Sequence, residues 1–149
     1  MPATPDSRAR TRAFARVIGP FIVIAPGIIV ARASDASMAT TLSAFFANEA
    51  LVWITGGLLL LVGIVIIAQH QYWSSLEAVI ISLFGWFLAL RGLVLLAAPQ
   101  WILDAARAGL RGGMLPIVQG GFGLLVLSGL WLAYVGWIRK PAADHKTAD

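Results

Sequence analysis

The sequence predicts an all-α polytopic membrane protein with four transmembrane helices, and three observations support this. The 149 residues are 59% hydrophobic and only 12% charged, with a mean hydropathy of +0.84, whereas soluble domains usually carry about 25% charged residues. Four apolar runs approach the ~20 residues that a helix needs to cross the hydrocarbon core of a bilayer. Basic residues gather beyond the outermost runs, as topology signals do. A soluble core of this size cannot bury so much apolar surface, so lipid is the expected solvent.

The predicted spans cover residues 14–33, 50–68, 76–98 and 114–138. Pro20 and Pro26 interrupt the first span, and proline removes a helical hydrogen bond, so a passive bend is expected there. Arg16 and Arg32 lie near its ends and need to extend toward the headgroups. A basic leader, an apolar core and the Ala-Arg-Ala sequence at 31–33 also fit a cleaved signal peptide. A retained span and a removed leader therefore both remain open for this run.

The runs show signs of an internal duplication. Shifted by 64 residues, the second run places Gly56 on Gly120, and shifted by 66, the first run places Gly19 on Gly85. Chance similarity is the alternative, because apolar segments share a small alphabet of residues. A true duplication predicts two tandem helical hairpins in the same orientation, related by an axis along the membrane normal.

The two longer connections predict short interfacial helices at about 35–48 and 100–112. Each carries an apolar stripe at helical spacing; the residues of the stripes are Met38, Leu42, Phe45 and Phe46 in the first and Ile102, Ala106 and Leu110 in the second. In the second helix the charged residues Asp104, Arg107 and Arg111 occupy another face. The connection at 69–75 is a tight turn between the second and third spans.

Counting Lys and Arg predicts the orientation. The basic N-terminal segment 1–13, the start of the first run, the short turn and the polar tail 139–149 share one side of the membrane and hold seven basic residues, against three on the other side. Because basic residues favour the cytoplasmic side, both termini are expected there, in a bacterial inner membrane. The net charge of +4 is thus assigned to lipid headgroups. No basic stretch is interleaved with base-stacking aromatics, so nucleic acid is not an expected partner.

Arg91 is the charged residue of greatest interest, because it lies within the third span. A charge at that depth costs perhaps ~1–3 kcal/mol unless it is paired or extends to the interface. Glu49 opens the second span on the same side, and we expect an Arg91–Glu49 ion pair. Two interpretations remain open: a structural arginine that fixes helix register, or a residue that lines a path for an ion or anion.

Three further polar residues are candidates. Glu77 and His70 lie near the inner interface, where they are expected either to be hydrated at headgroup level or to shuttle protons. Gln119 lies within the fourth span and is expected to hydrogen-bond between helices. The chain has no cysteine and only two histidines, so no metal site, cofactor site or catalytic group is expected.

Small residues recur at the spacing that brings helix backbones together, which is what drives helix association in lipid. The predicted helix-packing residues are Gly56, Gly63, Gly85, Ala89, Gly92, Gly129, Ala133 and Gly136. The pattern does not distinguish contacts within one chain from contacts between chains.

The stretch His70-Gln71-Tyr72-Trp73, followed by Gly85-Trp86, Arg91-Gly92 and Pro99, resembles a group of small four-span bacterial inner-membrane proteins without an assigned function. That group often has asparagine where this chain has Gln71. The resemblance covers about half of the chain; it implies the topology and a bacterial membrane, and it implies no activity.

Two functions are expected from these features. The first is a non-enzymatic membrane protein that packs against itself or a larger complex through helix–helix contacts, as an accessory or structural component. The second is a small oligomeric channel or transporter for an ion or small solute, with Arg91 and Glu49 lining the path. An enzyme is not expected, because the polar residues are scattered.

Overall fold

The computed structural model describes residues 5–70, 73, 75–110 and 113–139, and within these ranges the chain is helical without strands. The elements are α1 (Pro5–Arg32), α2 (Ala36–Ala47), α3 (Glu49–Gln69), α4 (Leu76–Ala97), α5 (Pro99–Gly109), α6 (Leu115–Ala133) and a final π-helical turn, η1 (Tyr134–Ile138). The predicted all-α fold is therefore confirmed.

Four of the helices are long and apolar enough to cross a membrane. They comprise residues 8–32, 49–69, 76–97 and 115–138. Large apolar side chains such as Trp53, Leu61 and Leu124 lie exposed on their outer surfaces. An apolar surface that continues around whole helices is stable in hydrocarbon and not in water. The prediction of a four-span membrane protein is confirmed at this level.

The first helix is longer than predicted. It begins at Pro5, so most of the segment expected as a separate basic N-terminus belongs to the helix, because Arg and Ala are strong helix formers and no breaker precedes Pro20. Pro20 and Pro26 lie inside one uninterrupted helix, as neighbouring helices allow in membrane proteins. Because α1 packs along α6, removing it as a cleaved leader would leave one face of α6 bare.

Side-chain caps define where the two central spans begin. The side chain of Asn48 accepts a hydrogen bond from Leu51 N at 3.2 Å, at the start of α3. Ser75 does the same for Ala78 N at 3.3 Å, at the start of α4. Each cap satisfies one of the amide groups that a helix leaves without an intrahelical partner.

The long helices form two closely packed pairs, α3 with α4 and α1 with α6. In the first pair, a Cβ added to Gly63 would overlap the backbone of Ala89. In the second, a Cβ added to Gly19 would come within 2.5 Å of Ala133 N. Consecutive spans α1 and α3 do not form such a pair, and neither do α4 and α6 to the same extent. The predicted pairing into two tandem hairpins is therefore not confirmed.

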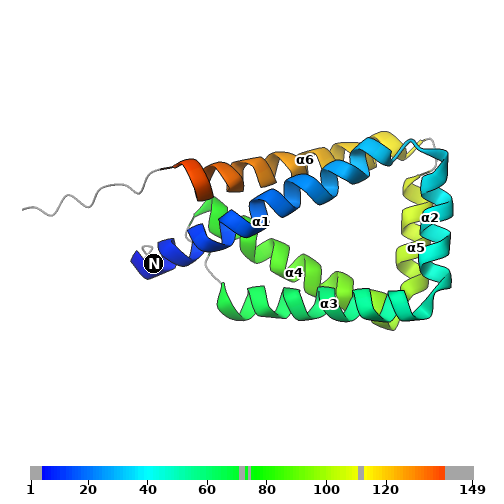
Figure 1. Ribbon diagram of the computed structural model, residues 1–149, viewed down its shortest axis with the longest axis horizontal. Coiled ribbons are helices and arrows are strands. Elements are labelled where there is room, and N and C mark those ends of the chain that lie inside the picture. Colours follow the sequence, from blue (N-terminus) through cyan, green and yellow to red (C-terminus); the bar gives the residue numbers. More distant parts are fainter. Residues whose placement is uncertain (1–4, 71–72, 74, 111–112, 140–149) are drawn as a thin grey trace, which may run out of the picture.

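The two pairs converge at one end of the molecule and separate toward the other (Figure 1). We call the end where α1 begins and η1 finishes the narrow end, and the end that carries α2 and α5 the wide end. A compact apolar core lies where the pairs meet; its buried residues are Ala15, Ile18, Ile22, Ile66, Ile81, Leu88 and Leu132. The beginning of α1 and the end of η1 therefore lie on the same side of the bundle.

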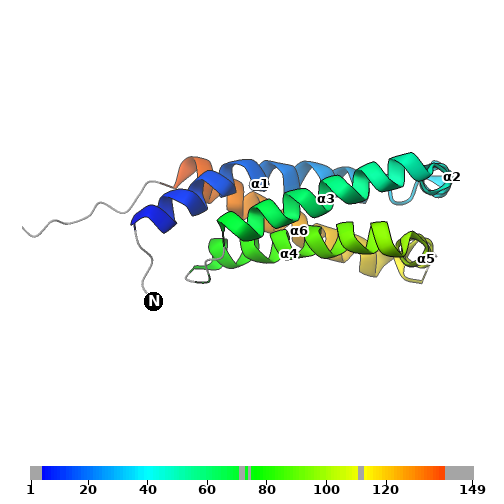
Figure 2. The same cartoon turned by 90° about the horizontal axis from the view of Figure 1, so that it is seen from below.

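The short helices α2 and α5 lie across the wide end and are seen end-on in Figure 2. They contact each other, and α2 also contacts α3 while α5 contacts α4 and α6. The predicted apolar stripes are their half-buried faces, whereas Asp104 and Arg107 are exposed. Helices thus form at both predicted positions, with Arg111 outside the described residues. Their location in the membrane interface stays a prediction.

The packing contacts reveal one constant sequence offset. Gly63 meets Ala89 between α3 and α4, and Gly129 meets Val23 between α1 and α6; the equivalent residues lie 66 positions apart in both cases. Ile66 and Leu132, both buried, are separated by the same interval. The shift of 64 read from the sequence for the second and fourth runs is therefore replaced by 66 at the packing positions.

Candidate functional site: polar residues at the two ends of the bundle

Arg16 ties the first helix to the last at the narrow end. Its Nε donates a hydrogen bond to the carbonyl oxygen of Gly136 at 2.8 Å, and its Cζ lies 5.8 Å from the ring centroid of Trp137. The indole Nε1 of Trp137 donates in turn to the carbonyl oxygen of Arg16 at 3.3 Å. This charged group is therefore engaged with the protein as well as being exposed.

His70 follows α3 at the same end and is completely buried. Its ring lies 5.3 Å from that of Phe14, centroid to centroid. Its carbonyl oxygen accepts a hydrogen bond from the hydroxyl of Ser82 at 3.2 Å. Burial lowers the pKa of His70 below its ordinary value, because the charged imidazolium loses its hydration. The expectation of a hydrated His70 at headgroup level is therefore wrong, because α1 and α4 close over it.

Glu77 pairs with Arg139 across the narrow end. Its Oε1 lies 3.8 Å from Nη1 of Arg139, and the exposed fraction of the side chain is 18% for Glu77 and 55% for Arg139. The pair connects the first turn of α4 with the residue that follows η1. A proton path between Glu77 and His70 stays a hypothesis.

Two of these hydrogen bonds occupy equivalent places in the two halves of the chain. Arg16 and Ser82 lie 66 residues apart, as do Gly136 and His70, and each side chain donates to the carbonyl oxygen of its partner. The duplicated packing therefore extends to side-chain hydrogen bonds. The narrow end holds the buried polar residues of the described chain, Thr11, His70 and Ser82.

Arg91 is exposed on α4, and neither Arg91 nor Glu49 forms an ion pair with another described residue. Arg91 lies two turns beyond Phe84, on the same face of α4, and Phe84 contacts Phe21 of α1 with ring centroids 6.3 Å apart. Arg91 therefore belongs to the face of α4 that looks toward α1, where the two helix pairs separate.

The expected pair between Arg91 and Glu49 does not form because the two residues differ in depth. Gly92, the neighbour of Arg91, packs against Leu60 of α3. About three helical turns of α3, roughly 16 Å, separate Leu60 from Glu49. Glu49 lies exposed at the wide end, so an intramolecular pair would require one helix to slide along the other.

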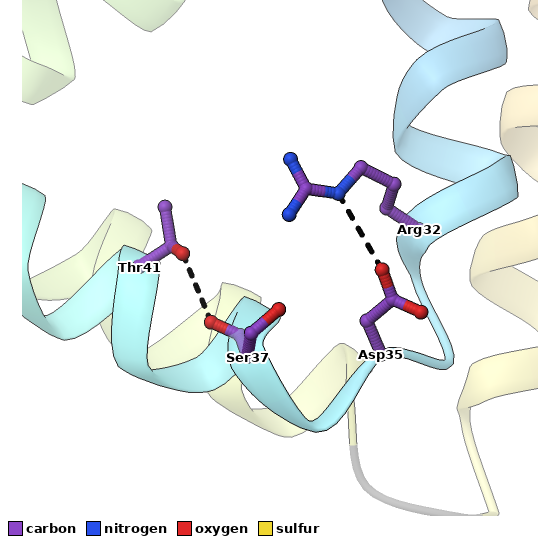
Figure 3. Close-up of polar contacts among 4 residues, drawn as sticks. All are labelled: Arg32, Asp35, Ser37 and Thr41. Carbon is purple, nitrogen blue, oxygen red and sulfur yellow. Dashed lines mark hydrogen bonds and ion pairs between the residues drawn. The ribbon is translucent and has the colours of Figure 1, made fainter.

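Gln119 lies at the wide end and donates from Nε2 to the hydroxyl of Ser34 at 3.4 Å. It thus joins α6 to the connection between α1 and α2, as expected for an interhelical hydrogen bond. In the same connection, Arg32 Nε lies 3.4 Å from Oδ2 of Asp35, and the hydroxyl of Thr41 donates to the carbonyl oxygen of Ser37 at 2.9 Å (Figure 3). These contacts hold the turn between the two helices.

The predicted helix-packing residues make their contacts inside the chain. Within α3 and α4, Gly56 faces Leu96 and Gly92, and Gly85 faces Ile66. Within α1 and α6, Gly129 approaches Val23 and Gly136 approaches the backbone of Arg16, with Ala133 opposite Gly19. The sequence pattern left the partner of these faces open, and the structure supplies an intramolecular one.

An apolar groove lies between α1 and α3 toward the narrow end, with a volume of about 490 Å³. Its walls are residues from two successive turns of each helix, and all of them are apolar: Ala13, Phe14, Val17, Ile18, Leu61, Val62, Val65 and Ile66. The groove exists because α1 and α3 pack against other helices and leave a space between them.

Sequence reasoning missed several of these residues. Thr11 and Ser82 are small polar residues without a distinctive motif, and Arg16 was interpreted only as an arginine near a span end. A 66-residue offset applied to every polar residue pairs Arg16 with Ser82, and this was the available signal. Within the described ranges, no three residues among His, Cys, Asp and Glu are placed to hold a metal ion.

Comparison with protein-family models found no match, and comparison with curated proteins and with solved structures found no significantly similar protein. The function of the chain is therefore inferred from its own residues.

Proposed function

We propose that the chain is a non-enzymatic integral membrane protein of the bacterial inner membrane that binds other transmembrane helices. It acts as an accessory subunit or structural component of a membrane complex. Its N- and C-termini face the cytoplasm, because the basic residues concentrate at the narrow end. The resemblance to small four-span inner-membrane proteins is in accord with this proposal.

The exposure of Arg91 carries the proposal. A cation within a span costs about 2.5–3.5 kcal/mol at the centre of the bilayer, and less near its ends. Arg91 lacks an ion pair among the described residues and lies on an exposed position of α4. A carboxylate on a partner helix offsets this cost and fixes the partner's depth and orientation.

Two open glycines support close approach of such a partner. An added Cβ at Gly57 of α3 or at Gly123 of α6 would meet no atom within 4 Å. The two positions are equivalent by the 66-residue offset, and both leave a shallow place where another helix can approach closely. The remaining helix-packing glycines are already used within the chain.

The channel or transporter is the alternative function. It requires Arg91 and Glu49 to line one path, and their difference in depth disfavours a path that both residues line. The groove between α1 and α3 is apolar and offers no ligands for an ion.

Crosslinking in native membranes tests the proposal. A photoreactive residue at Phe87, one turn from Arg91 and exposed, is expected to capture a partner helix. Arg91→Gln is expected to reduce the yield about tenfold, the effect of removing ~1.4 kcal/mol of interaction, while Arg91→Lys retains most of it. Arg107→Gln is the matched control, since Arg107 is an exposed cation of α5 outside the spans.

Charge reversal adds a sharper test. Arg91→Glu is expected to abolish capture, and changing the carboxylate of the captured partner to lysine is expected to restore it. Capture that is insensitive to Arg91→Gln would contradict the proposal. Solute flux in proteoliposomes that is lost in both Arg91→Gln and Glu49→Gln would favour the channel instead.

A further inference from the structure

The groove between α1 and α3 is continuous with a polar position on each helix. On α1, Arg10 precedes Ala13 by three residues and Val17 by seven, so it lies on the face of α1 that forms the groove. On α3, Gln69 follows Val65 by four residues and occupies the corresponding position. Arg10 and Gln69 are both exposed and both lie at the narrow end.

The chemistry of the groove defines its occupant. Every wall residue is apolar, so the part of the occupant that lies inside must be hydrocarbon. The mouth carries a guanidinium and a carboxamide, which both donate hydrogen bonds. Four arginines within residues 8–16 make this end strongly basic. A molecule with an apolar chain and an anionic head, present in every bacterial membrane, meets these requirements.

We propose that the groove holds one acyl chain of an anionic phospholipid from the leaflet at the narrow end. The phosphate of that lipid accepts hydrogen bonds from Arg10 and Gln69. The lipid stabilises the space between α1 and α3, which direct helix packing leaves unfilled. A zwitterionic lipid fills the same groove less well, because its ammonium group is repelled by the surrounding arginines.

Two variants on successive faces of α1 separate this site from general attraction to a basic surface. Arg10 lies on the groove face, and Arg12, two residues later, lies about 200° around the helix. Arg10→Gln and Arg12→Gln change the net charge equally. Native mass spectrometry of the full chain in detergent, titrated with phosphatidylglycerol or phosphatidylcholine, measures the lipid retained by each.

The wild-type chain is expected to retain one phosphatidylglycerol in preference to phosphatidylcholine. Arg10→Gln is expected to weaken retention about fivefold, the effect of one basic residue at an anionic lipid surface, and Arg12→Gln by less than about twofold. Val65→Trp fills the groove and is expected to abolish retention of the lipid while the thermal midpoint stays within a few degrees. Leu127→Trp, on an exposed position of α6, is the control for adding a large side chain.

Three outcomes would overturn the proposal. They are equal retention of the two lipids by the wild-type chain, equal losses in Arg10→Gln and Arg12→Gln, and undiminished retention in Val65→Trp. If Val65→Trp lowers the thermal midpoint strongly, Val62→Phe provides a smaller filling of the same groove. None of these measurements depends on Arg91 or on a protein partner, so the failure of this proposal is distinguishable from failure of the proposed function.

Discussion

The Nε of Arg16 and the carbonyl oxygen of Gly136 are 2.8 Å apart, and this bond joins the first helix of the chain to its last helical turn. Carbonyl groups at the end of a helix lack an intrahelical donor, and the guanidinium supplies one. The indole of Trp137 returns a hydrogen bond to the backbone of Arg16. The two bonds together fix how far α1 can slide along α6.

Replacing Arg16 is therefore expected to loosen the pair α1–α6. Arg16→Leu removes the charged hydrogen bond to Gly136 and the contact with the Trp137 ring, at a cost of about 1–3 kcal/mol. Unfolding in a denaturing detergent titration measures the change in free energy. Arg107→Leu, which alters an exposed arginine of α5, is expected to change stability by less than about 0.5 kcal/mol. Equal losses in the two variants would show that the bond adds nothing.

Two glycines of α3 are expected to respond oppositely to the same substitution. A Cβ at Gly63 overlaps the backbone of Ala89, whereas one at Gly57 meets nothing. Gly63→Ala is expected to destabilise the protein by about 1–3 kcal/mol, as overpacking does. Gly57→Ala is expected to be neutral or to stabilise by about 0.5–1 kcal/mol, because alanine favours the helix. Measuring both free energies of unfolding decides the point, and similar values would refute the close approach of α3 and α4.

Acidification is expected to destabilise the fold through His70. Burial lowers the pKa of His70 below its ordinary value of 6.5, so the unfolded chain binds the proton more readily than the folded one. Stability is fully present above about pH 6.5 and falls as the pH drops through 6 toward 5. The measurement is the thermal midpoint between pH 8 and pH 5. His70→Phe is expected to reduce this dependence, and His145→Gln, whose site lies outside the described residues, to preserve it. A flat wild-type profile would count against the buried histidine.

The Glu77–Arg139 pair is expected to contribute little, and to do so in a salt-dependent way. A double-mutant cycle with Glu77→Gln and Arg139→Gln should give a coupling of about 0.2–1 kcal/mol, decreasing at high ionic strength. The Arg32–Asp35 pair, with both side chains about half exposed, serves as the comparison and should give a coupling nearer to zero. A coupling that does not respond to salt would mean that the interaction is not an exposed ion pair.

Hydropathy alone predicted the four long helices to within one or two residues at most of their ends, because a span of this length leaves few alternatives. The exception is the start of α1, where helix propensity continues past the apolar run as far as Pro5. Helix pairing was not predictable in the same way. Apolar faces carry no label for a partner, and the spacing of Gly63 and Gly129 showed that each must approach a backbone without showing which one.

The candidate site was predictable only where a single residue determines the contact. Gln119 forms an interhelical hydrogen bond, as its position within a span suggested. Arg91 was identified as an intramembrane cation, but its pairing with Glu49 depends on the relative depth of α3 and α4, which the sequence does not encode locally. The burial of His70 depends on Phe14, more than fifty residues away.

The constant 66-residue offset bears on how such a fold arises. Each tight helix pair takes one member from the first half of the chain and one from the second, so neither half alone can cover its own glycines. Two copies of an ancestral half-length polypeptide, inserted in the same direction, would satisfy both sets of contacts as a symmetric dimer. Fusion of two such genes would then have freed each half to diverge, leaving an arginine at residue 16 where the other half has a serine.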